Sequence, residues 1–131
     1  MRGPLGPASL PISRTRAEEF DELVLDAVEH LEGRWSQELR TVEFAVEDVP
    51  PPDDPEGDGE QVESAGVPLS RLFRSAGRSP ARIVLYRRPI ELRSGDAAEL
   101  ADLLHDLVVE QVSRLLGLDP DTVDPGAGSE D

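Results

Sequence analysis

Two stretches of this sequence carry apolar side chains at the three- and four-residue spacing of an amphipathic helix, and they bracket most of the remaining chain. The later stretch runs between Asp96 and Gly117 and would bury one continuous stripe. Asp96 and Glu99 have the spacing of a helix N-cap, and Gly117 suits the left-handed residue that ends a helix. The predicted core side chains of this helix are Leu100, Leu103, Leu104, Leu107, Val108, Val112 and Leu115.

The earlier stretch predicts a second amphipathic helix that begins after Thr15. Thr15 and Glu18 have capping-box spacing, in which a hydroxyl and a carboxylate each accept a hydrogen bond from a backbone amide. Gly33 is the expected end of this helix, because glycine readily adopts the conformation found after a last helical turn. The predicted core side chains are Phe20, Leu23, Val24, Ala27, Val28 and Leu31.

The segments between the helices favour β-strands. Residues 41–49 alternate apolar and polar side chains, and residues 82–88 are β-branched and aromatic at their centre, before Pro89 limits further pairing. Residues 50–66 are rich in proline and acids, so we predict a long exposed acidic loop there. Residues 67–73 suit a short extended or irregular piece. The predicted fold class is α+β, with two long amphipathic helices packed on one face of a short β-sheet.

Charge and composition narrow the classes of function. The formal net charge of −15 repels nucleic acid and anionic membranes, so neither is predicted as a partner. The chain has no cysteine, which excludes disulfides, thiolate metal sites and thiol nucleophiles. No apolar run has the length of a signal peptide or membrane helix, so we predict a cytoplasmic protein. The folded domain is placed at residues 14–124, between a disordered arm over 1–13 and a disordered tail over 125–131.

Gln111 stands near the centre of the second apolar stripe, where leucine would be usual. At about 100° per residue, Glu110 and Arg114 lie together at one edge of that stripe, one turn apart. Their acid-before-base order favours an ion pair worth roughly 0.2–0.5 kcal/mol on an open helix surface. The three residues are either a charged edge with one tolerated amide, or the floor of a present or former site.

Several segments, taken in order, resemble the minimal zincin-like metallopeptidase family of bacteria. They are FDELVLDAVEHL, VEFAVEDVP, GVPLSRLF, RIVLYRRPIE and the helix that contains LLHDLVVEQVSRLLGL, and they cover most of the chain between Arg16 and Asp124. The arginine-only basic residues and the form VVEQVSRLLGL further resemble an actinobacterial branch of that family. The resemblance implies a minimal zincin architecture, the label of a metallopeptidase, and zinc as the family's cofactor.

Typical members of the family carry the motif H-E-x-x-H on the second long helix, followed by a glycine and an acidic ligand. Two imidazoles at i and i+4 bind one zinc ion, while the glutamate activates the water that the metal holds. When Gly117 is aligned with the family glycine, Glu110 and Arg114 fall on the two histidine positions and Gln111 falls on the glutamate position. The acidic ligand then falls on Pro120, between Asp119 and Asp121.

These substitutions remove the family's chemistry. Glutamine does not act as a general base near neutral pH, and a guanidinium does not bind zinc. A slip of one residue puts Glu110 on the glutamate position but leaves Val109 and Ser113 as the ligands. We therefore predict no catalytic residue and no metal ligand, with the zinc ligands of the family absent. A pair between Glu110 and Arg114 is predicted to replace the metal as the local cross-link.

Two other functions stay open at this point. One is an active metal-dependent peptidase with an atypical site built from Glu110, His105 and nearby aspartates, although helical geometry places His105 well away from Glu110. The other is a module that binds a protein or peptide segment by strand addition, in a groove inherited from a peptidase cleft. The other histidine of the chain is His30, which lies near the end of the predicted first helix. We predict no catalytic role for it.

An arginine-rich segment and a single tryptophan complete the candidates. Seven arginines face one acid, Glu91, within residues 71–93. This segment either binds an anionic partner or, as we favour, offsets the chain's own acidic loop and tails. Trp35 is predicted to pack over the corner between the first helix and the first strand. The arginines are Arg71, Arg74, Arg78, Arg82, Arg87, Arg88 and Arg93.

Overall fold

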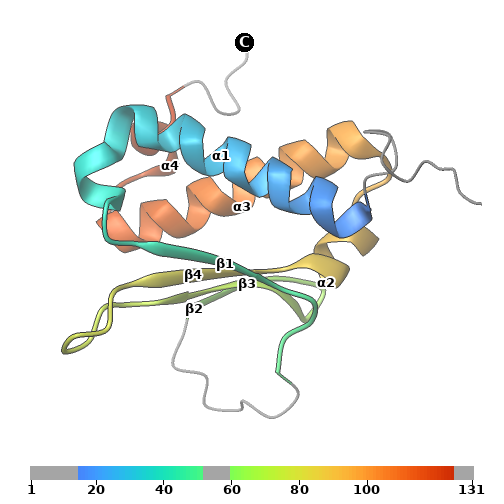
Figure 1. The fold of residues 1–131 in the computed structure, drawn as a ribbon, viewed down its shortest axis with the longest axis horizontal. Coiled ribbons are helices and arrows are strands. Elements are labelled where there is room, and N and C mark those ends of the chain that lie inside the picture. Colours follow the sequence, from blue (N-terminus) through green and yellow to red (C-terminus); the bar gives the residue numbers. More distant parts are fainter. Residues whose placement is uncertain (1–14, 52–59, 126–131) are drawn as a thin grey trace, which may run out of the picture.

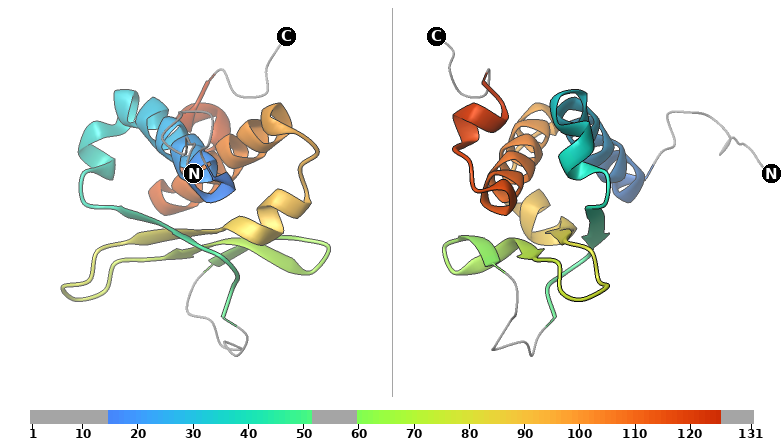
Figure 2. Two further views of the ribbon diagram at one scale, coloured as in Figure 1. Left: turned by 45° about the vertical axis from the view of Figure 1, so that its right-hand side comes forward. Right: turned by 90° about the vertical axis from the view of Figure 1, so that its left-hand side faces the viewer.

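The computed structural model describes residues 15–51 and 60–125 and has the predicted α+β architecture (Figure 1). Two long helices, α1 (Arg16–Leu39) and α3 (Ala97–Leu116), lie together over one face of a four-stranded sheet with strand order β1-β4-β3-β2. Figure 2 shows the two layers from further directions. The predicted N-terminal arm and all but the first residue of the predicted tail lie outside the described residues. No helix in the described part is long and apolar enough to cross a membrane.

Helix α1 begins as predicted but ends later. Thr15 Oγ1 accepts a hydrogen bond from the amide of Glu18 at 3.1 Å, and Glu18 Oε1 accepts one from the amide of Thr15 at 3.0 Å. The predicted end at Gly33 is wrong, because the helix continues to Leu39 through a kink at Trp35. Beyond the glycine, Leu39 is buried and Trp35 Nε1 donates to a backbone carbonyl of another element, so tertiary contacts outweigh glycine's weak helix-breaking preference.

Three strands lie next to one another in the sheet. β1 (Glu43–Glu47) pairs in parallel with β4 (Arg82–Tyr86), and β3 (Val67–Phe73) pairs with β4 in the antiparallel sense. The segment expected to be extended or irregular is therefore a regular internal strand. Helix α2 (Arg87–Leu92) follows β4 directly, so residues 87 and 88 are helical and not part of a strand. Pro89 lies in the first turn of α2, where its missing amide costs nothing.

Strand β2 (Glu60–Ser64) corrects the prediction of a loop over residues 50–66. It pairs with β3 in the antiparallel sense through a turn at Ala65 and Gly66, whose φ angles are +52° and +82°. Positive φ at both central residues is the requirement of the tight hairpin turn whose twist matches that of the strands. The remaining loop residues, 52–59, lie outside the described residues.

The core lies between the sheet and the two long helices. Ile83 and Leu85 reach it from the central strand β4, and all predicted side chains of the α3 stripe are buried or partly buried. A last short helix, α4 (Pro120–Val123), packs beside α3 and buries Val123. The fully buried apolar side chains of the core include Phe20, Leu31, Leu72, Ile83, Leu85, Ile90, Leu104, Val108, Val112 and Val123.

Candidate functional site

Helix α3 presents the three positions that the sequence singled out toward strands β2 and β3. The helix is fixed at both ends, because Asp96 Oδ1 accepts from the amide of Glu99 at 2.9 Å and Gly117 ends it with a φ of +72°. Its apolar stripe packs on the core, which sets the rotation of the helix about its axis. Gln111 therefore points into the interior, and its exposed fraction is 0%.

The side chain of Gln111 joins α3 to the sheet. Its Nε2 donates to the backbone carbonyl of Glu60 at 3.1 Å and to Ser70 Oγ at 2.9 Å. Its Oε1 is buried and has no hydrogen-bond partner among the described residues. The two hydrogen bonds satisfy the buried Ser70 hydroxyl and the partly buried Glu60 carbonyl, and a buried polar group left alone carries a desolvation penalty. Gln111 thus fixes where β2 and β3 lie against the helix.

Glu110 and Arg114 form the predicted ion pair, with Arg114 Nε at 2.9 Å from Glu110 Oε2. Both side chains are more than a third exposed, so solvent screening keeps the pair weak. Arg114 has a second role, because its Nη1 donates to the backbone carbonyl of Gln61 at 3.2 Å. Two neighbouring carbonyls of β2 therefore accept hydrogen bonds from α3, one from Gln111 and one from Arg114.

A second arginine extends this contact between α3 and β2. Arg74 pairs with the Glu60 carboxylate and donates from Nη2 to the backbone carbonyl of Arg114 at 2.9 Å. The hydrogen bond from Arg74 lowers the pKa of the Glu60 carboxyl, against the smaller opposing effect of burial. Glu60 therefore stays charged at the start of β2.

Other members of the arginine-rich segment also bond to the chain itself. Arg87 lies 3.1 Å from Asp48 and 3.1 Å from Glu91, and Arg93 donates to the backbone carbonyl of Ser64 at 2.9 Å. The acids that Arg87 pairs with, Asp48 and Glu91, lie outside the acidic loop and tails that were expected to be offset by this segment. A further pair joins Arg82 to Glu47 at 3.7 Å.

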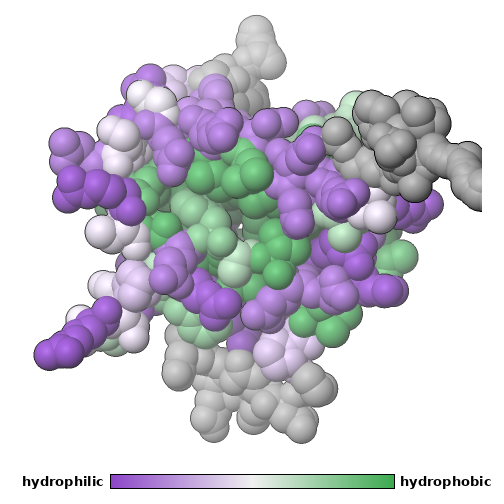
Figure 3. Space-filling view, viewed as in Figure 1, coloured by the Kyte–Doolittle hydropathy of each residue, from purple (hydrophilic) through white to green (hydrophobic). Residues whose placement is uncertain are grey.

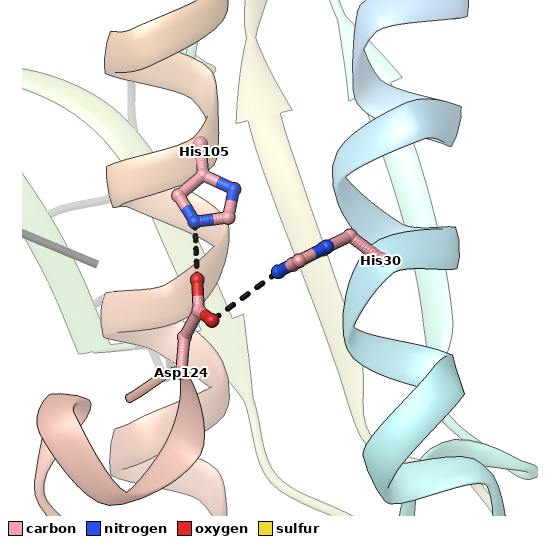
Figure 4. Close-up of side chains that lie close together, drawn as sticks. All are labelled: His30, His105 and Asp124. Carbon is pink, nitrogen blue, oxygen red and sulfur yellow. Dashed lines mark hydrogen bonds and ion pairs between the residues drawn. The ribbon is translucent and has the colours of Figure 1, made fainter. Parts of the chain in front are cut away.

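A second group of polar side chains lies between α1, α3 and the residue that follows α4 (Figure 4). Asp124 Oδ2 is 2.6 Å from His105 Nε2, and Asp124 Oδ1 is 3.2 Å from His30 Nε2. The two imidazole rings meet edge to face, with centroids 5.3 Å apart. One carboxylate thus bridges a histidine of α1 and a histidine of α3.

The carboxylate of this group is the most buried of the three side chains. The exposed fractions are 9% for Asp124, 29% for His105 and 57% for His30. Burial alone would raise the pKa of Asp124, but hydrogen bonds from His30 and His105 outweigh it and hold that pKa below its ordinary value. Asp124 is therefore a charged acceptor fixed between two imidazoles.

The structure separates the residues of the atypical peptidase site that the sequence left open. Glu110 pairs with Arg114, whereas His105 points to Asp124. Asp119 is the N-cap residue of α4 and Asp121 is exposed. Glu110 and His105 are therefore not brought to one common ion by this geometry.

Sequence reasoning set His30 aside and did not consider Asp124. Spacing along the chain gives no signal for this pair, because the two residues lie 94 positions apart. They meet only because α1 packs against α3 and α4 folds back beside them. Sequence reasoning also did not predict that Trp35 Nε1 donates to the backbone carbonyl of Val123 at 2.8 Å and so joins α1 to α4.

Comparison with known proteins gave one family. The sequence model of that family, described as zincin-like metallopeptidase, matches residues 39–128 of this chain. The matched range begins at the last residue of α1 and includes the whole sheet, α3 and α4. A comparison with curated proteins gave no match.

Proposed function

Because the chain belongs to the zincin-like metallopeptidase family, we propose that it is a member without peptidase activity. In this proposal, the face of α3 that would hold zinc holds the sheet instead. The observation that carries it is the pair of hydrogen bonds from Gln111 and Arg114 to the carbonyls of Glu60 and Gln61. Gln111 and Arg114, bonded to the sheet in this way, would hold α3 against β2 and would not bind a metal ion or a substrate.

The residues at the motif positions do not fit the family's zinc ion. A catalytic zinc needs three protein ligands and an open position for water. Arg114 is a permanent cation with no lone pair to offer, and it lies 2.9 Å from Glu110, the only carboxylate of the three positions. Gln111 would stand in for the general base, but an amide does not take up a proton near neutral pH. No metal-dependent step is assigned to this face of the helix.

We expect the full chain to leave a broad library of peptides uncut when it is incubated with excess zinc. Mass spectrometry of the peptides before and after incubation measures this directly. Glu110→Gln supplies the matched control, because it removes the one carboxylate at the motif positions while preserving its size. Cleavage that the parent performs and Glu110→Gln abolishes would show a working site on α3 and would overturn the proposal.

A second candidate function, binding of an extended protein segment, is favoured by the edges of the sheet. The edge beside α3 is β2, two of whose carbonyls are already bonded by Gln111 and Arg114. The other edge is β1, which pairs with β4 on one side. Strand addition therefore fits β1 better than β2, the edge strand beside α3.

An apolar hollow lies between β1 and α1 and is seen face on at the centre of Figure 3. Leu25 of α1, which is 57% exposed, lines it together with Phe44 and Val46 of β1. Asp21, Asp48 and Arg87 also line it, and Arg87 pairs with Asp48 at 3.1 Å, which leaves the lining one net negative charge on a chain whose net charge is −15. The partner that suits this surface is an extended segment in which apolar residues alternate with lysine or arginine.

We expect such basic, alternating peptides to bind the full chain, and their acidic counterparts not to bind. Leu25→Lys should weaken binding at least about tenfold, because it places a charge in the apolar hollow and repels the basic peptide. Val49→Lys is the matched control, since Val49 is 53% exposed but does not line the hollow. Fluorescence anisotropy of labelled peptides measures both variants. This surface would be ruled out if both variants lost the same affinity for the basic peptides, or if acidic peptides bound as tightly as basic ones.

A further inference from the structure

We propose that His30, His105 and Asp124 form a binding site for a transition-metal ion, with zinc as the expected occupant. The three side chains come from α1, α3 and the residue after α4, and their ligand atoms all lie within 4.8 Å of one another. Within residues 15–51 and 60–125, no other three histidine or carboxylate side chains bring ligand atoms this close. Glu110 is not among them, so this site is separate from the motif positions on α3.

The three ligand groups lie close enough for a modest adjustment of the side chains to bring them to one ion. Zinc bonds to nitrogen and oxygen are about 2.0–2.1 Å long, so ligands in a tetrahedral site lie about 3.3 Å apart. His105 Nε2 lies 2.6 Å from Asp124 Oδ2, His30 Nε2 lies 3.2 Å from Asp124 Oδ1, and the ligand atoms of the three residues all lie within 4.8 Å of one another. An ion would enter between the groups and replace their direct hydrogen bonds. His30 is the most exposed of the three, so its imidazole has room to make the largest adjustment.

The ligand set selects the class of ion. Two imidazole nitrogens and one carboxylate oxygen suit zinc and its neighbours among the transition metals, whereas magnesium and calcium prefer oxygen alone. Three protein ligands leave the fourth tetrahedral position open for water, as in sites where zinc is accessible to a small ligand. The expected occupant is therefore an exchangeable zinc ion with a bound water.

The buried ligand is held in place by its surroundings. The Asp124 amide donates to the Pro120 carbonyl at 2.9 Å, and the preceding residue, Val123, is fully buried. Trp35 Nε1 binds the Val123 carbonyl, so the backbone just before the carboxylate is fixed from two sides. A ligand that is already fixed loses little conformational freedom when the metal binds, which favours affinity.

The alternative is that the carboxylate simply joins α4 to the helix pair with no metal involved. Zinc titration of the untagged full chain separates the two possibilities. Trp35 is the single tryptophan and touches the residue next to Asp124, so its fluorescence reports on the site. We expect saturable binding of one zinc per chain, confirmed by calorimetry, and a rise in the midpoint of thermal unfolding with zinc concentration.

His105→Ala, His30→Ala and Asp124→Asn should each raise the Kd for zinc at least about tenfold, since each removes a ligand. Asp121→Asn and Glu110→Gln are matched controls and should leave the Kd unchanged. Should Asp124→Asn fail to fold, His30→Ala keeps the test decisive, because His30 is mostly exposed. The proposal is wrong if the parent shows no saturable binding, or if the three ligand variants bind zinc as the parent does.

Discussion

Gln111→Glu is expected to lower the free energy of unfolding by about 3 kcal/mol at pH 7. The change exchanges one NH2 group for an oxygen, and in the proposed register it restores the residue type of the family's motif. The new carboxyl would be fully buried and would face the Glu60 carbonyl and the Ser70 hydroxyl, where the amide now donates. A charged carboxylate loses its hydration there and is repelled by the carbonyl oxygen.

The stability that Gln111→Glu loses should increase with pH. Burial raises the pKa of the new carboxyl in the folded protein above its unfolded value of about 4.3. The folded variant then holds a proton that the unfolded chain releases. The difference in free energy of unfolding between parent and variant is therefore smallest below the unfolded pKa, and it grows as the pH rises toward the folded pKa. We expect the deficit relative to the parent to shrink by about 2 kcal/mol between pH 7 and pH 5.

Urea unfolding of the parent and two variants at both pH values measures these differences. Gln111→Met is the control of similar length, which loses the same two hydrogen bonds but adds no charge. Its cost should be about 1–2 kcal/mol and should not change with pH relative to the parent. If Gln111→Glu were as stable as the parent at pH 7, residue 111 would face a polar, hydrated site and the structural role proposed for it would be wrong.

The parts of the fold that follow from short-range patterns were predictable from the sequence. The α3 stripe, its cap at Asp96 and its end at Gly117 depend on residues within one helix, and the structure confirms them. The ion pair between Glu110 and Arg114 is likewise a one-turn contact. Gln111 was identified as unusual, but its partners in β2 and β3 lie 51 and 41 positions away, beyond the reach of periodicity.

The errors arose where tertiary contacts overrode local preference. The acid-rich sequence of β2 gives a poor strand signal, yet its first residue, Glu60, pairs with Arg74 and its backbone is held by α3. Gly33 signals a helix end, but buried contacts beyond it carry α1 onward to Leu39. The group of His30, His105 and Asp124 depends on three separate elements, so only the packed structure brings it into view.

Phe20→Ala is expected to lower the free energy of unfolding by about 3–5 kcal/mol, the range for a large aromatic side chain removed from a core. The family match begins at residue 39, which leaves open whether α1 belongs to the domain. Phe20 is fully buried, and α1 supplies five other buried side chains to the same core, at Val24, Ala27, Val28, Leu31 and Leu39.

Leu25→Ala is the matched control on the same helix, since Leu25 is largely exposed and its loss should change stability by no more than about 0.5 kcal/mol. Chemical denaturation of both variants and the parent provides the comparison. A cost below about 1 kcal/mol for Phe20→Ala would mean that α1 is an appendage with little core of its own. The result also bears on the proposed metal site. His30 reaches Asp124 from α1, so a helix that packs only loosely would not hold it at 3.2 Å from that carboxylate.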